Sequence, residues 1–226
     1  MTYLHMDDFL EAVRNNNLDA AKDYIENGID LNIKDSHGKD ALIYTCINGN
    51  QKILRLLIQN GVDVNTIYAG NKTPLIIAAA NGNTNIVNTL LKSGAKIDFQ
   101  DCKGWTALMH AVQINDLTTV LVLLKHEANV NLRDKEGWTA LLIASTPKSP
   151  DIVNLLLDND SDVNVRTNAG LSPLILAIIY KRIESIQLLV NNGADIYSKD
   201  QLDRSAVDLA KEYNDQEIEK ILENRL

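Results

Sequence analysis

Apolar and small side chains recur along the chain with a period of 33 residues. The pentapeptide GWTAL occupies residues 104–108 and returns at residues 137–141. One column of the pattern holds an aliphatic residue: Leu42, Leu75, Leu108, Leu141, Leu174 and Val207. Three positions later stands a small residue: Thr45, Ala78, Ala111, Ala144, Ala177 and Ala210. Because no insertion or deletion shifts these columns, the sequence predicts one structural unit repeated along the chain.

Each unit is predicted to be a pair of helices joined by a short turn. The first helix follows a residue whose side-chain oxygen can accept from a free backbone N–H at the helix start. These capping residues are Asp40, Thr73, Thr106, Thr139, Ser172 and Ser205. The second helix carries its apolar residues on one face, as Val120, Leu123 and Leu124 show. One such pair has too little interior to fold alone, so the units are expected to stack on a shared core.

A glycine is predicted to end most of the second helices, because the residue after a helix often needs a positive φ. Gly61 and Gly94 are examples, but Glu127 and Asp160 stand at the same position in two later units. Either these two residues adopt the left-handed conformation, or the two turns are built differently.

Two stretches depart from the repeated pattern. Gly70 comes one residue early and Asn71 occupies the place of glycine, so this turn is expected to be rebuilt. In the fifth unit the segment STPKSPD occupies residues 145–151. Pro147 is predicted to end the first helix early, and Ser149 with Pro150 is predicted to start the second helix.

These columns resemble those of the ankyrin-repeat family. The segments GNKTPLIIAAANGNTNIVNTLLKSGAKID, at residues 70–98, and GWTALMHAVQINDLTTVLVLLKHEANVN carry the resemblance, which extends over the whole chain. It implies an all-α ankyrin-repeat solenoid of about seven helix–turn–helix repeats, with short β-hairpin "fingers" between repeats. One domain, 1–226, is expected: an N-terminal capping repeat at about 7–38, internal repeats over 39–203, and a C-terminal capping repeat over 204–226.

The chain departs from the family's T-P-L-H motif, because no repeat has the histidine. That position holds Ile43, Ile76, Met109, Leu142, Ile175 and Asp208. The usual hydrogen bond between threonine and histidine is therefore lost, and apolar packing is expected in its place.

Net charge and hydropathy narrow the class of partner. The formal net charge of −8 disfavours a nucleic-acid or anionic-membrane partner, because phosphate groups require a basic face. The acidic excess is expected on the second helices and in the last repeat. No apolar run approaches about 18 residues, and the start MTYLHMDDFLEAV has no signal-peptide pattern, so a cytoplasmic protein is expected.

The sequence offers little for catalysis or for metal binding. It lacks the usual nucleotide-binding, zinc-protease and paired-cysteine motifs. Asp158, Asp160 and Asp162 have the spacing of a calcium loop, but Val163 stands where glycine is required. Cys46 is expected in the core and Cys102 on the surface. The histidines are scattered at His5, His37, His110 and His126. No catalytic residue, metal site or cofactor is predicted.

The resemblance implies that a partner binds on the concave side, which the fingers and the exposed ends of the first helices form. Three apolar residues precede consecutive capping residues: Trp105, Trp138 and Leu171. Ile114 and Tyr180 occupy first-helix ends. The candidate cations on the fingers are Lys103, Arg133 and Arg166. Alternatively, the tryptophans only brace their own fingers, and the cations only keep the fingers soluble.

The hypothesis is a non-catalytic protein–protein interaction module that serves as an adaptor, scaffold or inhibitor. Its partner would be a protein with an acidic, partly apolar patch, and the chain itself a monomer. An exported effector acting on host proteins is the alternative, suggested only by the acidic tail EYNDQEIEKILENRL. A metal-binding or enzymatic protein is the third and weakest possibility, because no motif supports it.

Overall fold

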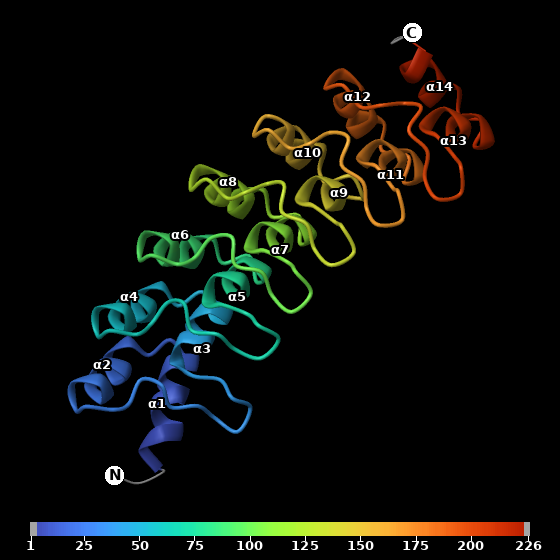
Figure 1. Cartoon of the computed structure of the whole chain (residues 1–226). Helices are drawn as coiled ribbons and strands as arrows, with labels where there is room; N and C mark the ends of the chain where they lie inside the picture. The colour runs from blue at the N-terminus through green and yellow to red at the C-terminus, as the bar shows by residue number, and fades with distance from the viewer. Residues whose placement is uncertain (1–3, 224–226) are drawn as a thin grey trace. The chain divides into compact units, whose positions relative to one another are not determined.

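The computed structural model describes the backbone of residues 4–223 and the side chains of residues 7–223. Fourteen α-helices lie in this part of the chain (Figure 1). They are α1 (Leu4–Arg14), α2 (Leu18–Glu26), α3 (Ala41–Asn48), α4 (Gln51–Gln59), α5 (Pro74–Ala80), α6 (Thr84–Lys92), α7 (Ala107–Gln113), α8 (Leu117–Lys125), α9 (Ala140–Ala144), α10 (Pro150–Leu157), α11 (Pro173–Ile179), α12 (Ile183–Asn191), α13 (Ala206–Glu212) and α14 (Gln216–Glu223). The predicted series of seven helix pairs is confirmed.

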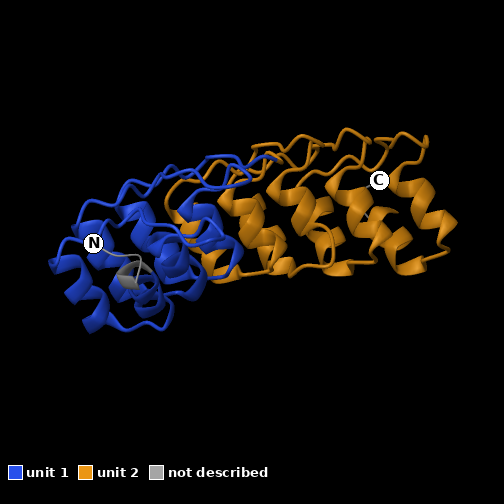
Figure 2. Ribbon diagram, turned by 90° about the horizontal axis from the view of Figure 1, so that it is seen from below, with its two compact units in different colours: residues 1–102 blue, residues 103–226 orange. Residues whose placement is uncertain are grey.

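The chain divides into two compact units, residues 1–102 and residues 103–226 (Figure 2). In unit 1 the first helices α1, α3 and α5 pack in succession, and so do the second helices α2, α4 and α6. Unit 2 repeats this arrangement with α7, α9, α11 and α13 in one row and α8, α10, α12 and α14 in the other. Each unit is therefore a stack of helical hairpins.

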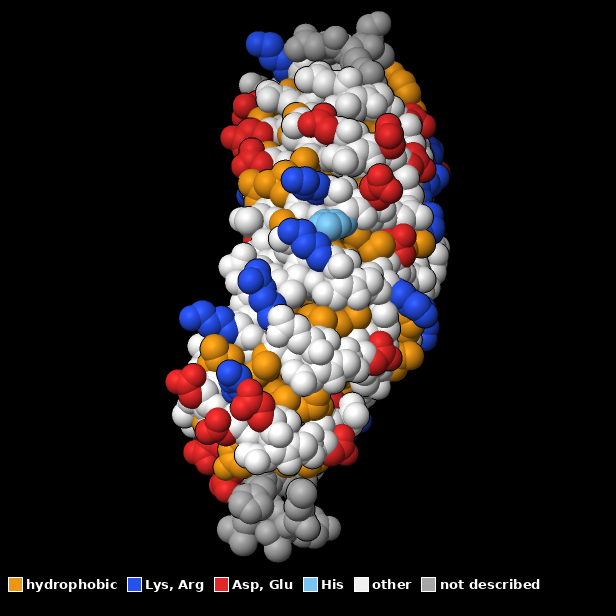
Figure 3. Space-filling view, turned by 90° about the vertical axis from the view of Figure 1, so that its left-hand side faces the viewer, with side chains coloured by type: hydrophobic (Ala, Val, Ile, Leu, Met, Phe, Trp, Pro, Cys, Tyr) orange, Lys and Arg blue, Asp and Glu red, His pale blue; other side chains and the backbone are white. Residues whose placement is uncertain are grey.

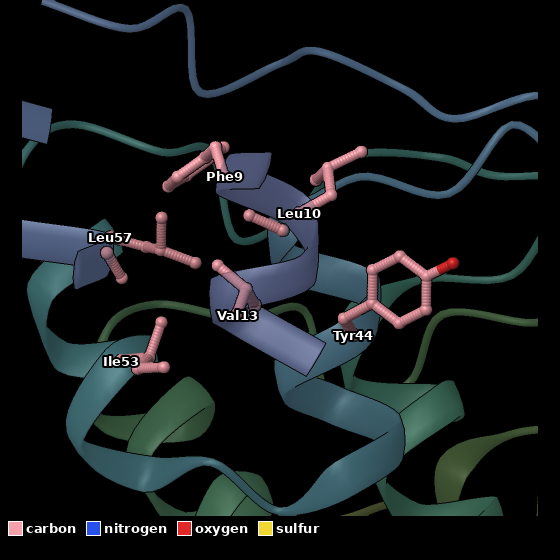
Figure 4. Close-up of a cluster of buried hydrophobic side chains, with 8 residues drawn as sticks. Phe9, Leu10, Val13, Tyr44, Ile53 and Leu57 are labelled. Atoms are coloured by element: carbon pink, nitrogen blue, oxygen red, sulfur yellow. The ribbon is translucent and has the colours of Figure 1, made fainter. Parts of the chain in front are cut away.

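The core of each unit lies between its two rows of helices. At the start of unit 1, Phe9 and Val13 from α1 meet Ile53 and Leu57 from α4 (Figure 4). All four side chains are fully buried. The small column is also buried, which lets neighbouring first helices approach closely. Burial of aliphatic surface, at about 25 cal/mol per Å², is the main force that holds the hairpins together.

The predicted caps are present at the first helices. Thr73, Thr106 and Ser172 each accept a hydrogen bond from the amide three residues later, in α5, α7 and α11. At α13 the expected apolar packing in place of histidine is wrong. Ser205 and Asp208 form a reciprocal capping box instead, with their side-chain oxygens 2.6 Å apart.

The two exceptional second-helix ends keep the same backbone path as the others. Glu127 has φ 63° and Asp160 has φ 62°, beside 86° for Gly61 and 87° for Gly94. Both residues therefore adopt the left-handed conformation, at a cost of about 1 kcal/mol each for a residue with a Cβ atom. The rebuilt turn at Gly70 and Asn71 is also confirmed, because both residues have positive φ.

The fifth helix pair is shortened as predicted. Helix α9 has five residues, whereas α7 and α11 have seven each. Ser149 caps α10, and Pro150 takes its first position. The turn between α9 and α10 therefore occupies residues 145–149, a segment used again below.

The acidic excess is distributed differently from the expectation for the second helices. Helices α4, α6 and α8 contain Lys52, Arg55, Lys92 and Lys125 but no carboxylate. The expectation holds for α14, which has three glutamates. Figure 3 shows the face of the second helices: acidic side chains of unit 1 gather toward its N-terminal end, and those of unit 2 toward its C-terminal end.

Candidate interaction surface

The fingers are the connections that lead from each second helix to the next first helix. Over residues 4–223 the fingers form no β-strands, and the expected β-hairpins are reduced to one isolated bridge between Tyr68 and Lys72. Backbone hydrogen bonds close them, as between the Asp134 amide and the Trp138 carbonyl. In the finger of Asp134, its carboxylate accepts from the amides of Glu136 and Trp138. Asp200 binds the amides of Leu202 and Arg204 in the same way. These recurrent aspartates therefore have a structural role in the fingers.

Backbone hydrogen bonds tie neighbouring fingertips of unit 2 together. The amide of Lys135 donates to the Lys103 carbonyl, and the amide of Asn168 donates to the Glu136 carbonyl. Gly104 is necessary here, because a Cβ atom at that position would lie 2.9 Å from the Asp134 Cα. The fingers of unit 2 thus form a continuous strip in which each tip is held by its neighbour.

Trp105 is half-buried and connects two fingers. Its indole Nε1 donates to the Asp134 carboxylate of the next finger at 2.9 Å. Its ring lies 5.2 Å from the ring of His110 on α7. These contacts support a bracing role and leave only part of the indole for a partner.

Trp138 and Leu171 are half-buried in a small apolar cluster. They pack against Leu142, Val165 and Leu176, which are buried residues of the fifth and sixth repeats. This environment again supports bracing of the fingers. A role of these two side chains in partner contact stays a prediction.

The predicted cations also have contacts within unit 2. The Arg133 guanidinium donates to the Arg166 carbonyl, and the Arg166 guanidinium donates to the Gly170 carbonyl. Lys103 is exposed, and its carbonyl accepts the bond from Lys135. The arginines therefore stabilise the fingers while their charge stays near the surface.

Among the predicted apolar contact residues, Ile114 and Tyr180 are the most exposed to solvent. Ile114 is 44% exposed and Tyr180 is 46% exposed. They are the C-cap residues of α7 and α11, two repeats apart and at the same position in the repeat. Large apolar side chains at this level of exposure are available to a partner. Sequence reasoning missed Tyr213, which shares this position in the last repeat, although the period of 33 leads to it.

The described side chains do not gather as a metal site requires: no three His, Cys, Asp or Glu lie together within residues 7–223. The side chain of His5 lies outside this range. Cys46 is buried, and burial raises the pKa of its thiol, whereas Cys102 is exposed. Both cysteines are free. No helix in the described residues is long and apolar enough to cross a membrane.

Stacked helical hairpins with fingers at a period of 33 residues define a repeat protein of the solenoid class. The family described as "Ankyrin repeats (3 copies)" matches residues 9–101, 93–167 and 151–200. The chain belongs to this family, whose members are in general protein–protein interaction modules and typically lack catalytic activity.

Comparison with solved structures supports the same assignment. The crystal structure of the human ASB11 ankyrin repeat domain superposes with a TM-score of 0.83 and 27% sequence identity. The match covers 96% of this chain and 97% of that domain. A search of curated proteins gave no significant match.

Proposed function

We propose that the chain is a non-catalytic protein–protein interaction module that acts as an adaptor, scaffold or inhibitor. Its partner binds the face lined by the fingers and first-helix ends, which the family presents as a concave surface. The observation that carries the proposal is the exposure of Ile114 and Tyr180 at equivalent positions on a braced scaffold. A rigid support keeps the entropy lost on binding small, so such residues are effective anchors.

The electrostatic part of the proposal rests on the fingers. Arg133 and Arg166 lie on neighbouring fingers, and the exposed Lys103 lies on the finger before them. These cations favour a partner with an acidic, partly apolar patch, and they would act mainly on the rate of association. Two free cysteines are consistent with a cytoplasmic location.

The test compares partner capture by the full chain and by a double variant, Ile114→Asn with Tyr180→Asn. The equivalent positions in unit 1 hold asparagine, at Asn48 and Asn81, so the variant is expected to fold. The expected result is loss of specific prey proteins by the double variant. Thermal unfolding followed by circular dichroism checks that the stack is intact.

Leu121→Asn is the matched control, because Leu121 is 47% exposed but lies on the second helix α8. The control should keep every prey that the wild-type chain captures. If the double variant kept the same prey at the same yield, partner binding through the first-helix ends would be refuted.

A further inference from the structure

One position in the repeat is apolar throughout unit 2. It is the C-cap position of α7, α11 and α13, and in the fifth repeat it lies three residues after the end of the shorter α9. It holds Ile114, Pro147, Tyr180 and Tyr213, which we call the apolar row. Ile114, Pro147 and Tyr180 are exposed, and Tyr213 is half-buried. In Figure 1 the four first helices that carry this row, α7, α9, α11 and α13, follow one another in line.

Side-chain contacts join every pair of neighbouring turns along the row. Between the fourth and fifth repeats, the Lys148 ammonium donates to the Gln113 carbonyl at 2.6 Å. The Arg182 guanidinium donates to the Lys148 carbonyl at 3.2 Å and links the fifth repeat to the sixth. The Lys181 ammonium lies 5.9 Å from the centre of the Tyr213 ring and links the sixth repeat to the last. The row is therefore a continuous surface.

Positive charge is concentrated at the two central turns of the row. Residues 145–149 and 178–183 contain Lys148, Lys181 and Arg182 and no carboxylate. Their backbone and ring contacts leave the three charges without a carboxylate partner inside these turns. The centre of the row therefore favours an acidic segment.

The carboxylates nearest to the row lie outside these two turns. Asp116 caps α8, and Asp151 hydrogen-bonds to Ser149 in the cap of α10. Glu184 lies in the first turn of α12. Glu212 and Asp215 flank Tyr213 at the last repeat, where an acidic segment is expected to end.

The spacing of the row selects a conformation for the segment. Successive first helices of unit 2 pack directly on one another, which places their axes about 8–10 Å apart. A polyproline II helix has three residues per turn and rises about 3.1 Å per residue, so one of its faces repeats about every 9.3 Å. Every third side chain of such a segment can therefore meet one residue of the row. Aromatic side chains, such as Tyr180 in the row, line the grooves that typically bind this conformation.

We propose that the apolar row binds an acidic segment of a partner protein in the polyproline II conformation, with an apolar residue at every third position. The apolar residues contact Ile114, Pro147 and Tyr180, and the acidic residues between them pair with Lys148 and Lys181. This inference rests on the proposed function, and it specifies the kind of segment that the same face recognises.

The experiment measures fluorescence anisotropy of a labelled peptide titrated with the full chain. The probe has four prolines, each separated from the next by two glutamates. A second peptide has three glutamates between prolines, and a third has lysines in place of the glutamates. We expect the first peptide to bind at least about tenfold more tightly than the other two, with affinity that falls as salt is added.

Two single variants test whether the peptide binds at the apolar row. Tyr180→Asn and Lys181→Glu should each weaken binding of the first peptide by about tenfold, whereas Leu121→Asn should leave it unchanged. Equal affinity for the two proline spacings, or unchanged binding by Tyr180→Asn, would overturn the proposal. So would absence of binding at about 1 mM chain, the upper end of weak specific association.

The two proposals fail in different ways. Absence of peptide binding, together with prey capture that depends on Ile114 and Tyr180, overturns the segment proposal and leaves the proposed function standing. Prey capture that is independent of both residues overturns the proposed function itself.

Discussion

The Tyr68 hydroxyl donates to both carboxylate oxygens of Asp40, at 2.9 Å and 3.1 Å. Asp40 caps α3 and is buried, and it stands where later repeats have threonine or serine. Tyr68 stands where other fingers have aspartate, such as Asp134. The finger between α4 and α5 and the cap of α3 thus have, in place of the usual residues, a tyrosine–aspartate pair that spans two repeats.

Tyr68→Phe should lower the free energy of unfolding by about 1–3 kcal/mol, because it leaves a buried carboxylate without one of its donors. Urea unfolding followed by circular dichroism measures the change. Tyr197→Phe is the control, since Tyr197 is 58% exposed and should change stability little. Equal effects of the two substitutions would show that the hydroxyl of Tyr68 is not important for stability.

Asp200 should make unit 2 sensitive to acid. Burial raises the pKa of its carboxyl, but hydrogen bonds from the Arg204 amide and guanidinium and from the Leu202 amide outweigh burial. The net pKa is lower than the ordinary value of an aspartate. The folded state therefore holds the ionised form more strongly than the unfolded state does. Its contribution to stability is complete above about pH 5, where the unfolded carboxyl is also ionised, and is lost as pH falls through the lowered pKa.

Urea midpoints of the wild-type chain and of Asp200→Asn, measured between about pH 6 and about pH 3, test this dependence. The stability difference between the two proteins should shrink as the pH falls. A difference that stayed constant over this range would contradict the assigned role of the ionised carboxylate.

Asn131 joins the fourth repeat to the fifth. Its side chain donates to the Asp160 carbonyl at 3.0 Å and accepts from the Asp162 amide at 2.9 Å. Asn131→Ala should destabilise the chain by about 1–2 kcal/mol, since two hydrogen bonds are lost. Asn131→Asp keeps the acceptor and loses the donor, so its denaturation midpoint should fall between those of the wild type and the alanine variant. Wild-type stability of Asn131→Ala would argue against the bridge.

Glu127→Gly should stabilise the chain by up to about 0.5 kcal/mol. The gain comes from relief of the left-handed strain, reduced by the greater freedom of glycine in the unfolded state. Gly94→Ala at the equivalent position is the converse change and should destabilise the chain. Differential scanning calorimetry of both variants gives the sign directly, and a lower melting temperature for Glu127→Gly would contradict the prediction.

The parts of the fold that depend on local sequence were predictable. Caps such as Thr106, the early end of α9 before Pro147 and the left-handed glycines each follow from the preferences of a few consecutive residues. The period of 33 residues then repeats the same local structure along the chain. The prediction that acidic residues lie on the second helices failed, because the period says nothing about exposed positions, which vary freely between repeats.

The candidate site was harder to predict, because its contacts join residues about one repeat apart. Trp105 binds Asp134 only when the next finger is stacked beside it. The same applies to Trp138, whose cluster includes Val165 and Leu176. A sequence column shows that residues are equivalent, but it does not show which of their atoms the neighbouring repeat will cover.

The strip of fingertips in unit 2 also limits how the chain can change in evolution. Its backbone hydrogen bonds join each finger to the next, as Lys135 is joined to Lys103. Duplication or deletion of a complete repeat recreates the same junction, whereas an insertion of a few residues in a finger breaks the junctions on both sides. Gene rearrangements that preserve the 33-residue step are therefore tolerated most easily, and the length of the protein is expected to vary by whole repeats.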